Sequence, residues 1–132
     1  MDHAGGRYYK KALDDWQATF DSVHDSIMLI DKNHRIVKAN RATAEFLSLP
    51  LEKIIGRHCY ELVHGSHESP SVCPFSKTLV SKKFEEAEMY LPERDMWIWV
   101  TSSPIFDEHG DIAMATHVIR DVTAHRKLEE KL

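Results

Sequence analysis

The stretch HCYELVHGSHESPSVCPF, residues 58–75, holds both cysteines of the chain and three of its nine histidines. Thiolates and imidazoles are the groups that bind zinc and iron in proteins, and Zn²⁺ accepts mixed sulfur and nitrogen ligands in a tetrahedron. Paired thiols can also form a redox couple. The stretch could therefore hold a metal, act as a redox pair or serve as a structural loop.

The metal hypothesis assigns Cys59, His64 and Cys73 to zinc or iron, with His58 or His67 as the fourth ligand. The spacing of these residues matches no standard zinc finger or ribbon. A disulfide or redox pair between Cys59 and Cys73 is the second hypothesis. The sequence favours a third, a structural loop whose buried thiols behave as small apolar groups.

Outside this stretch the sequence contains no catalytic pattern. It has no nucleophile elbow, glycine-rich phosphate loop, paired carboxylates beside an apolar run, or H-E-x-x-H motif. Glu85, Glu86 and Glu88 fit the solvated face of a strand. His117 lies in a β-rich run and is expected to be a hydrogen-bonded sheet histidine, not a ligand. We therefore expect no enzymatic activity from this domain.

Composition and charge exclude several classes of partner. The chain of 132 residues fits one domain, with 42% hydrophobic and 29% charged residues. Its net charge is −4 with both signs interspersed, so no basic surface for nucleic acid or a membrane is expected. No apolar run approaches the ~20 residues that span a bilayer, and two cysteines suit a reducing compartment. A cytoplasmic location is predicted, and any membrane anchor would lie in other parts of a parent protein.

Residues 1–24 are predicted to be a flexible start, MDHAGG, followed by an amphipathic helix. Large apolar side chains recur at spacings of three and four residues and so share one face of that helix: Tyr9, Leu13, Trp16, Phe20 and Val23. A stripe this large exceeds what one small sheet can cover. We therefore expect a homodimer formed through the helix that carries Leu13, Trp16, Phe20 and Val23.

Residues 25–122 are predicted to form the core of the domain. Two strands at 26–31 and 35–40 make a hairpin, and short helices follow at 40–49, 51–56 and 73–83. Three strand-like runs come next, at 84–91, 96–106 and 111–120, the last two joined by the turn DEHG. Strands joined by short turns pair antiparallel, so this order predicts an α+β fold with helices on one face of an antiparallel sheet.

Five short motifs occur in order along the chain: DSIMLID at 25–31, Asn40, IIG at 54–56, SPIFDEHG at 103–110 and RDVT at 120–123. Together they resemble a PAS domain of the bacterial signalling type, and the resemblance covers nearly the whole chain from Trp16 onward. It implies a five-stranded antiparallel sheet with short helices on one face. An N-terminal amphipathic helix and a C-terminal linker helix, beginning within residues 123–132, would flank this core.

The resemblance also implies a role in signal transduction. PAS domains are sensory and dimerisation modules found upstream of histidine kinases, diguanylate cyclases or chemoreceptor domains. The expected function is a sensor that binds a small ligand between sheet and helices and passes the change through the C-terminal helix to a covalently linked output domain. The alternative is a ligand-free dimerisation and spacing module. Haem, flavin, metabolites or no ligand at all occur on this fold, so the cofactor stays open.

The segment GRHCYELV resembles, in its placement, the reactive-cysteine motif of flavin-binding light sensors. His58, Tyr60 and Val63 replace the polar residues of that motif, which would leave a flavin poorly paired, so light sensing is not expected. The segment is also similar to a C-Y-x-x-x-H-G insertion followed by C-x-x-C-P. Pro70 stands where that pattern has a further cysteine. Haem would need Cys73 or Met89, because the helix at 73–83 carries no histidine.

Asp121 and Thr123 lie where the last strand is expected to pass into the C-terminal helix. The Asp121 carboxylate can accept N–H groups at the start of that helix. In PAS domains the D-V-T segment couples the domain to its effector, often through a salt bridge from the aspartate to a basic group. We therefore assign Asp121 and Thr123 to signal transmission.

Overall fold

The computed structural model describes residues 3–70 and 72–131. It contains five strands, which are β1 (Ser26–Asp31), β2 (Ile36–Ala39), β3 (Glu85–Leu91), β4 (Met96–Phe106) and β5 (Ile112–Asp121). The helices are α1 (His3–Ser22), α2 (Arg41–Leu47), α3 (Cys59–His64), α4 (Pro74–Ser81) and α5 (Thr123–Lys131), and two 3₁₀ turns are η1 (Leu51–Lys53) and η2 (Pro92–Arg94). None of the described helices is long and apolar enough to cross a membrane.

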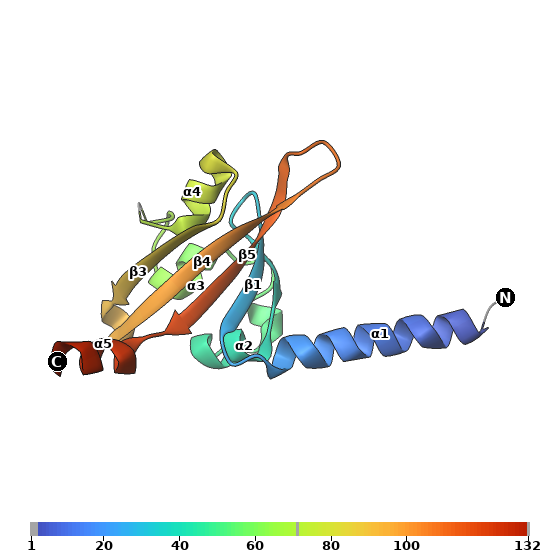
Figure 1. Ribbon diagram of the computed structural model, residues 1–132, viewed down its shortest axis with the longest axis horizontal. Helices are drawn as coiled ribbons and strands as arrows, with labels where there is room; N and C mark the ends of the chain where they lie inside the picture. Colours follow the sequence, from blue (N-terminus) through green and yellow to red (C-terminus); the bar gives the residue numbers. More distant parts are fainter. Residues whose placement is uncertain (1–2, 71, 132) are drawn as a thin grey trace.

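The strands form one antiparallel sheet in the order β2-β1-β5-β4-β3 (Figure 1). The short helices α2, α3 and α4 lie on one face of the sheet, whereas α1 and α5 lead away from it. The α+β architecture and the five-stranded sheet predicted from the sequence are confirmed.

The buried face of the sheet follows the period of two that strands impose. In β1 the residues Ser26, Met28 and Ile30 point inward. In β3, Glu86 and Glu88 lie on the exposed side as predicted, whereas Glu85 is half-buried because it shares the inner side of the strand with Met89. The side chain of Phe75, from the first turn of α4, is fully buried against this face together with Ile54. Burial of these apolar groups holds the helices onto the sheet.

Asn40 joins three segments of the chain through its fully buried side chain. Its Oδ1 accepts hydrogen bonds from the N–H of Ile27 at 3.0 Å and from the N–H and Oγ1 of Thr43 at 3.1 and 2.9 Å. Its Nδ2 donates to three backbone carbonyls at 3.0–3.4 Å, those of Phe20, Val23 and Asp25. The amide therefore caps α2 and fixes the path by which α1 leads into β1.

Several local features differ from the sequence predictions. The helix α1 begins at His3, so it includes residues that were expected in a flexible start, while residues 1–2 lie outside the described range. It ends at Ser22, which places Val23 just after the helix. The helix α3 was not predicted at all.

Replacing Asn40 by aspartate should destabilise the domain strongly. The carboxylate would face the three carbonyl oxygens that Nδ2 now satisfies, and it would be buried without a counter-charge. We expect a loss of about 3 kcal/mol or more in the free energy of unfolding, measured by urea denaturation. The matched change Asn33→Asp, in the exposed β1–β2 turn, should alter stability by no more than about 0.5 kcal/mol. Equal effects of the two changes would contradict this role for Asn40.

Candidate functional site

A small cavity lies between the sheet and the helical layer. Its free volume is about 10 Å³, the room that a single water molecule needs. Val63, Ile98, Val100 and Ile119 form its apolar wall. Five residues with sulfur or imidazole groups complete much of the lining, namely Cys59, His64, Cys73, Met89 and His117.

The structure brings the three predicted ligand residues to this one cavity. Cys59 is the first residue of α3, His64 is its last, and Cys73 precedes α4. The helix α3 ends there because Gly65 adopts the left-handed conformation, with φ 63°. Within residues 3–70 and 72–131, however, no group of three or more His, Cys, Asp or Glu side chains is arranged to hold a metal ion.

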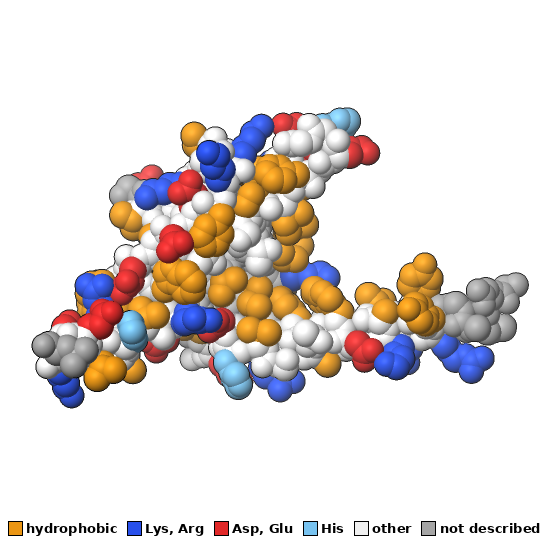
Figure 2. Space-filling model, viewed as in Figure 1, with side chains coloured by type: hydrophobic (Ala, Val, Ile, Leu, Met, Phe, Trp, Pro, Cys, Tyr) orange, Lys and Arg blue, Asp and Glu red, His pale blue; other side chains and the backbone are white. Residues whose placement is uncertain are grey.

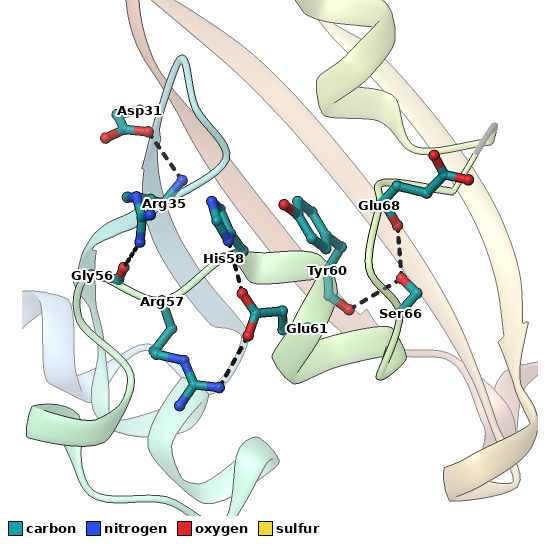
Figure 3. A network of polar contacts seen from close by, with 9 residues as sticks. All are labelled: Asp31, Arg35, Gly56, Arg57, His58, Tyr60, Glu61, Ser66 and Glu68. Carbon is teal, nitrogen blue, oxygen red and sulfur yellow. Dashed lines mark hydrogen bonds and ion pairs between the residues drawn. The ribbon is translucent and has the colours of Figure 1, made fainter.

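Neither residue proposed as a fourth ligand lines the cavity. His58 stacks on Tyr60 and its Nδ1 lies 2.7 Å from Oε1 of Glu61 (Figure 3). Glu61 also pairs with Arg57 at 3.1 Å. His67 is exposed in the segment after α3. The metal hypothesis therefore stays a prediction, without the fourth ligand that the sequence offered for it.

Both cysteines are free thiols and each is 5% exposed. Burial, with a contribution from the nearby Cys73, raises the pKa of the Cys59 thiol to about 12. Cys59 is therefore protonated at neutral pH, and a protonated thiol is a poor nucleophile and a poor redox partner. This environment supports the structural interpretation of the stretch over a redox pair.

Hydrogen bonds outside the cavity fix the position of α3. The N–H of Cys59 donates to the His34 carbonyl at 2.9 Å. Arg35 Nη1 donates to the Gly56 carbonyl at 2.7 Å (Figure 3). The N–H of Arg35 in turn donates to Asp31 Oδ1 at 3.0 Å. The β1–β2 turn therefore holds the start of α3, and with it Cys59, against the cavity.

His117 of β5 is the residue of the cavity that sequence reasoning judged wrongly. It is 6% exposed, and no described residue offers a hydrogen-bond partner to its Nδ1. Burial, helped by the nearby His64 and His34, lowers its pKa from 6.5 to about 4. Ser102, its partner across the β4–β5 ladder, also has a buried hydroxyl without a described partner. His117 is therefore a neutral imidazole with a free nitrogen, not the hydrogen-bonded histidine that was expected.

The strand that carries His117 leads directly into the junction with α5. The N–H of Thr123 donates to Asp121 Oδ1 at 2.9 Å, which makes Asp121 the cap of the helix start. Thr123 Oγ1 accepts the N–H of Trp97 at 2.9 Å, and the N–H of Val122 donates to the Trp97 carbonyl at 2.9 Å. The predicted transmission residues, Asp121 and Thr123, thus fasten α5 to β4.

Two arginines strengthen this end of the sheet. Arg120 forms a two-pronged ion pair with Asp25, with Nη2 and Nε at 2.7 and 3.1 Å from Oδ2. The pair connects residues 95 positions apart in the chain. Arg126 of α5 lies over the Trp97 ring at 3.7 Å and pairs with Glu88 at 2.8 Å. The ion pair that the resemblance suggested for Asp121 is not formed among the described residues, because the Asp121 carboxylate accepts the Thr123 N–H and Arg120 pairs with Asp25 instead.

The helix α1 leads away from the domain with an exposed apolar face (Figure 2). Leu13 is 67% and Trp16 is 45% exposed. Trp16 stacks on Phe20 at 5.0 Å, and Lys38 of β2 lies over the Trp16 ring. The stripe predicted for a dimer therefore exists on the described helix, and most of it is not covered within one chain.

The sequence of residues 24–124 matches the family model of the PAS domain. The chain belongs to the PAS domain family. PAS domains are generally sensory modules without catalytic activity. No curated protein matches the sequence.

Solved PAS domains share the fold at low sequence identity. The PAS domain of a protein from Colwellia psychrerythraea has a TM-score of 0.69 at 23% identity, and the match covers 86% of this chain and 98% of that one. That of an HTR-like protein from Haloarcula marismortui has a TM-score of 0.73 at 16% identity, with coverages of 91% and 99%. A sensory box sensor histidine kinase structure from Vibrio cholerae has a TM-score of 0.59 at 20% identity, with coverages of 90% and 98%.

The depressed pKa of His117 makes the stability of this PAS domain depend on pH. The unfolded chain takes up a proton at His117 below about pH 6.5, whereas the folded domain resists it until about pH 4. Stability is therefore lost as the pH falls through this window. For His117 alone we expect a loss of about 2 kcal/mol between about pH 7 and pH 5, measured by urea unfolding.

The variant His117→Leu should show a smaller loss over the same interval. Its remaining dependence would come from His34 and His64, whose pKa values burial also lowers. The control His67→Asn changes an exposed histidine and should behave like the unmodified domain. An unchanged pH dependence in His117→Leu would contradict the assignment.

Proposed function

We propose that this PAS domain is the sensory module of a bacterial signalling protein. It binds a small ligand in the cavity between sheet and helices and passes the change through α5 to a covalently linked output domain, such as a histidine kinase. The observation that carries the proposal is the course of β5. One strand holds the unpartnered His117 in the cavity and, four residues later, the Asp121 cap of α5.

The distance between these two points suits mechanical coupling. Four residues of strand span about 13 Å. Over this length β5 is paired with β4 throughout, and with β1 as far as Ile119. A ligand that displaces the His117 side chain would also shift the backbone of β5, the strand that ends at Asp121. The shift of β5 would reach Trp97 through its hydrogen bonds to Thr123 and Val122.

The exposed face of α1 supports dimerisation as part of the same function. Signalling through a helix that leaves the domain benefits from a second copy against which the helix can move. We propose a homodimer in which the α1 helices pack through Leu13, Trp16 and Phe20. Val23 lies beyond the end of α1 and would border this contact.

The second candidate function is a ligand-free dimerisation and spacing module. It is favoured by the cavity volume of about 10 Å³, which leaves no room for haem, flavin or a metabolite in this conformation. Both functions include the dimer, and they differ in whether His117 contacts a ligand. Detection of a ligand bound in the cavity would favour the sensor over the ligand-free module.

The transmission role of the junction is tested by Thr123→Val in the parent protein with its output domain. The change keeps the β-branched shape and removes the hydroxyl that accepts the Trp97 N–H. We expect basal output or signal response to change severalfold while the domain stays folded by circular dichroism. Asp121→Ala, which removes the helix cap, should shift output in the same way.

The matched control is Thr116→Val, the same chemical change on β5 outside the junction. It should leave output as in the unmodified protein. Unaltered output in both Thr123→Val and Asp121→Ala, with stability reduced by about 1 kcal/mol, would make these residues structural only.

The dimer is tested by replacing Leu13 with lysine and Trp16 with glutamine. Neither side chain belongs to the buried core, since Leu13 is 67% and Trp16 is 45% exposed in the single chain, so the variant should remain folded and become monomeric. Sedimentation or light scattering would report the mass. The control Val80→Lys changes an apolar side chain on α4 that is 86% exposed, and it should leave the dimer intact. A dimer that persists in the α1 variant would place the interface elsewhere.

A further inference from the structure

We propose that the cavity beside His117 takes a small uncharged molecule with an apolar body and one hydroxyl group. The hydroxyl would pair with His117 Nδ1, and the body would lie against the apolar wall. This inference rests on the proposed sensory function and adds the chemical class of the ligand.

The lining of the cavity excludes charged ligands. Among the described residues that line it there is no lysine, arginine, aspartate or glutamate. The two histidines on the lining, His64 and His117, favour the neutral form because burial lowers the pKa of each. A carboxylate or phosphate would therefore lose its hydration without gaining a counter-charge, which is costly in a buried site.

The polar and apolar parts of the cavity define the complementary ligand. Val63, Ile98, Val100 and Ile119 offer apolar surface, and His117 Nδ1 is a buried nitrogen without a described partner. A neutral imidazole nitrogen is a donor in one tautomer and an acceptor in the other. A hydroxyl group can serve either tautomer, because it both donates and accepts. An unsatisfied buried nitrogen costs free energy, so a ligand that satisfies it gains affinity.

The size of the cavity identifies the side chain that limits entry. The free volume of about 10 Å³ holds one water, so a larger molecule must displace part of the lining. Met89 of β3 is half-buried and lines the cavity. Its unbranched thioether side chain has three rotatable bonds and adapts readily. Truncation of Met89 to alanine would therefore enlarge the cavity without touching His117.

The test compares three probes of one shape: benzyl alcohol, toluene and benzoate. Binding to the domain and to Met89→Ala is measured by isothermal titration and by amide shifts in nuclear magnetic resonance spectra. We expect benzyl alcohol to bind Met89→Ala with one-to-one stoichiometry, more tightly than it binds the unmodified domain. It should exceed toluene by about fivefold, the value of one neutral hydrogen bond, and benzoate by more than tenfold.

The double variant Met89→Ala, His117→Leu identifies the group that recognises the hydroxyl. It should lose the preference for benzyl alcohol over toluene while retaining toluene binding. Leucine in this buried place removes an unsatisfied nitrogen, so folding should be preserved. Retention of the preference in the double variant would overturn the role of His117.

Other outcomes also overturn the proposal. Benzoate binding as tightly as benzyl alcohol would show that the site accepts charge. Stoichiometric zinc or iron in protein purified without chelator, lost in Cys73→Ser, would assign the cavity to a metal. No binding of any probe to Met89→Ala would reject the ligand class, whereas the sensory function stands or falls separately on the output of Thr123→Val.

Discussion

Strand β5 lies between β1 and β4 and is hydrogen-bonded to both, so the sheet is complete only when the last strand of the chain inserts beside the first. This constraint places His117 opposite Met28 on one side and Ser102 on the other, in the middle of the buried face. The same strand ends at Asp121, where α5 begins. The cavity and α5 therefore share one strand, β5. Because β5 is paired with both β1 and β4, it cannot shift without affecting its neighbours. The proposed function depends on this shared strand more than on any single contact.

The two terminal helices, α1 and α5, both leave the domain at the same end of the sheet and extend in opposite directions (Figure 1). Asn40 ties the end of α1 to α2 and β1, and the ion pair between Asp25 and Arg120 ties the start of β1 to the end of β5. These bonds link the end of α1 to the strand that supports α5. In the proposed function, a signal enters through the cavity or through α1 and leaves by the junction where Thr123 accepts the Trp97 N–H.

The sequence predicts the fold well because its evidence is local. Alternating residues in β3, the DEHG turn between β4 and β5, and the cap at Asp121 are each encoded within a few neighbouring positions. Long-range features are not encoded in this way. The pair Asp25–Arg120 joins positions 95 residues apart, and the unpartnered nitrogen of His117 follows from what packs around it. The helix α3 was not predicted, because its six residues are too few to show a helical period. Its cysteine and histidine, Cys59 and His64, were interpreted as potential ligands instead. The three predicted ligand residues, Cys59, His64 and Cys73, do line one cavity, because α3 and the start of α4 bring them there.

The central claim is that a ligand bound in the cavity changes the structure at the start of α5. The direct measurement is a titration of ¹⁵N-labelled protein with benzyl alcohol, following the backbone amides of His117, Trp97 and Thr123 by nuclear magnetic resonance spectroscopy. The account predicts that the amides of Trp97 and Thr123 shift together with that of His117 and saturate at the same ligand concentration. Saturation at His117 with no shift at Trp97 and Thr123, or no saturable shift at His117, would contradict it.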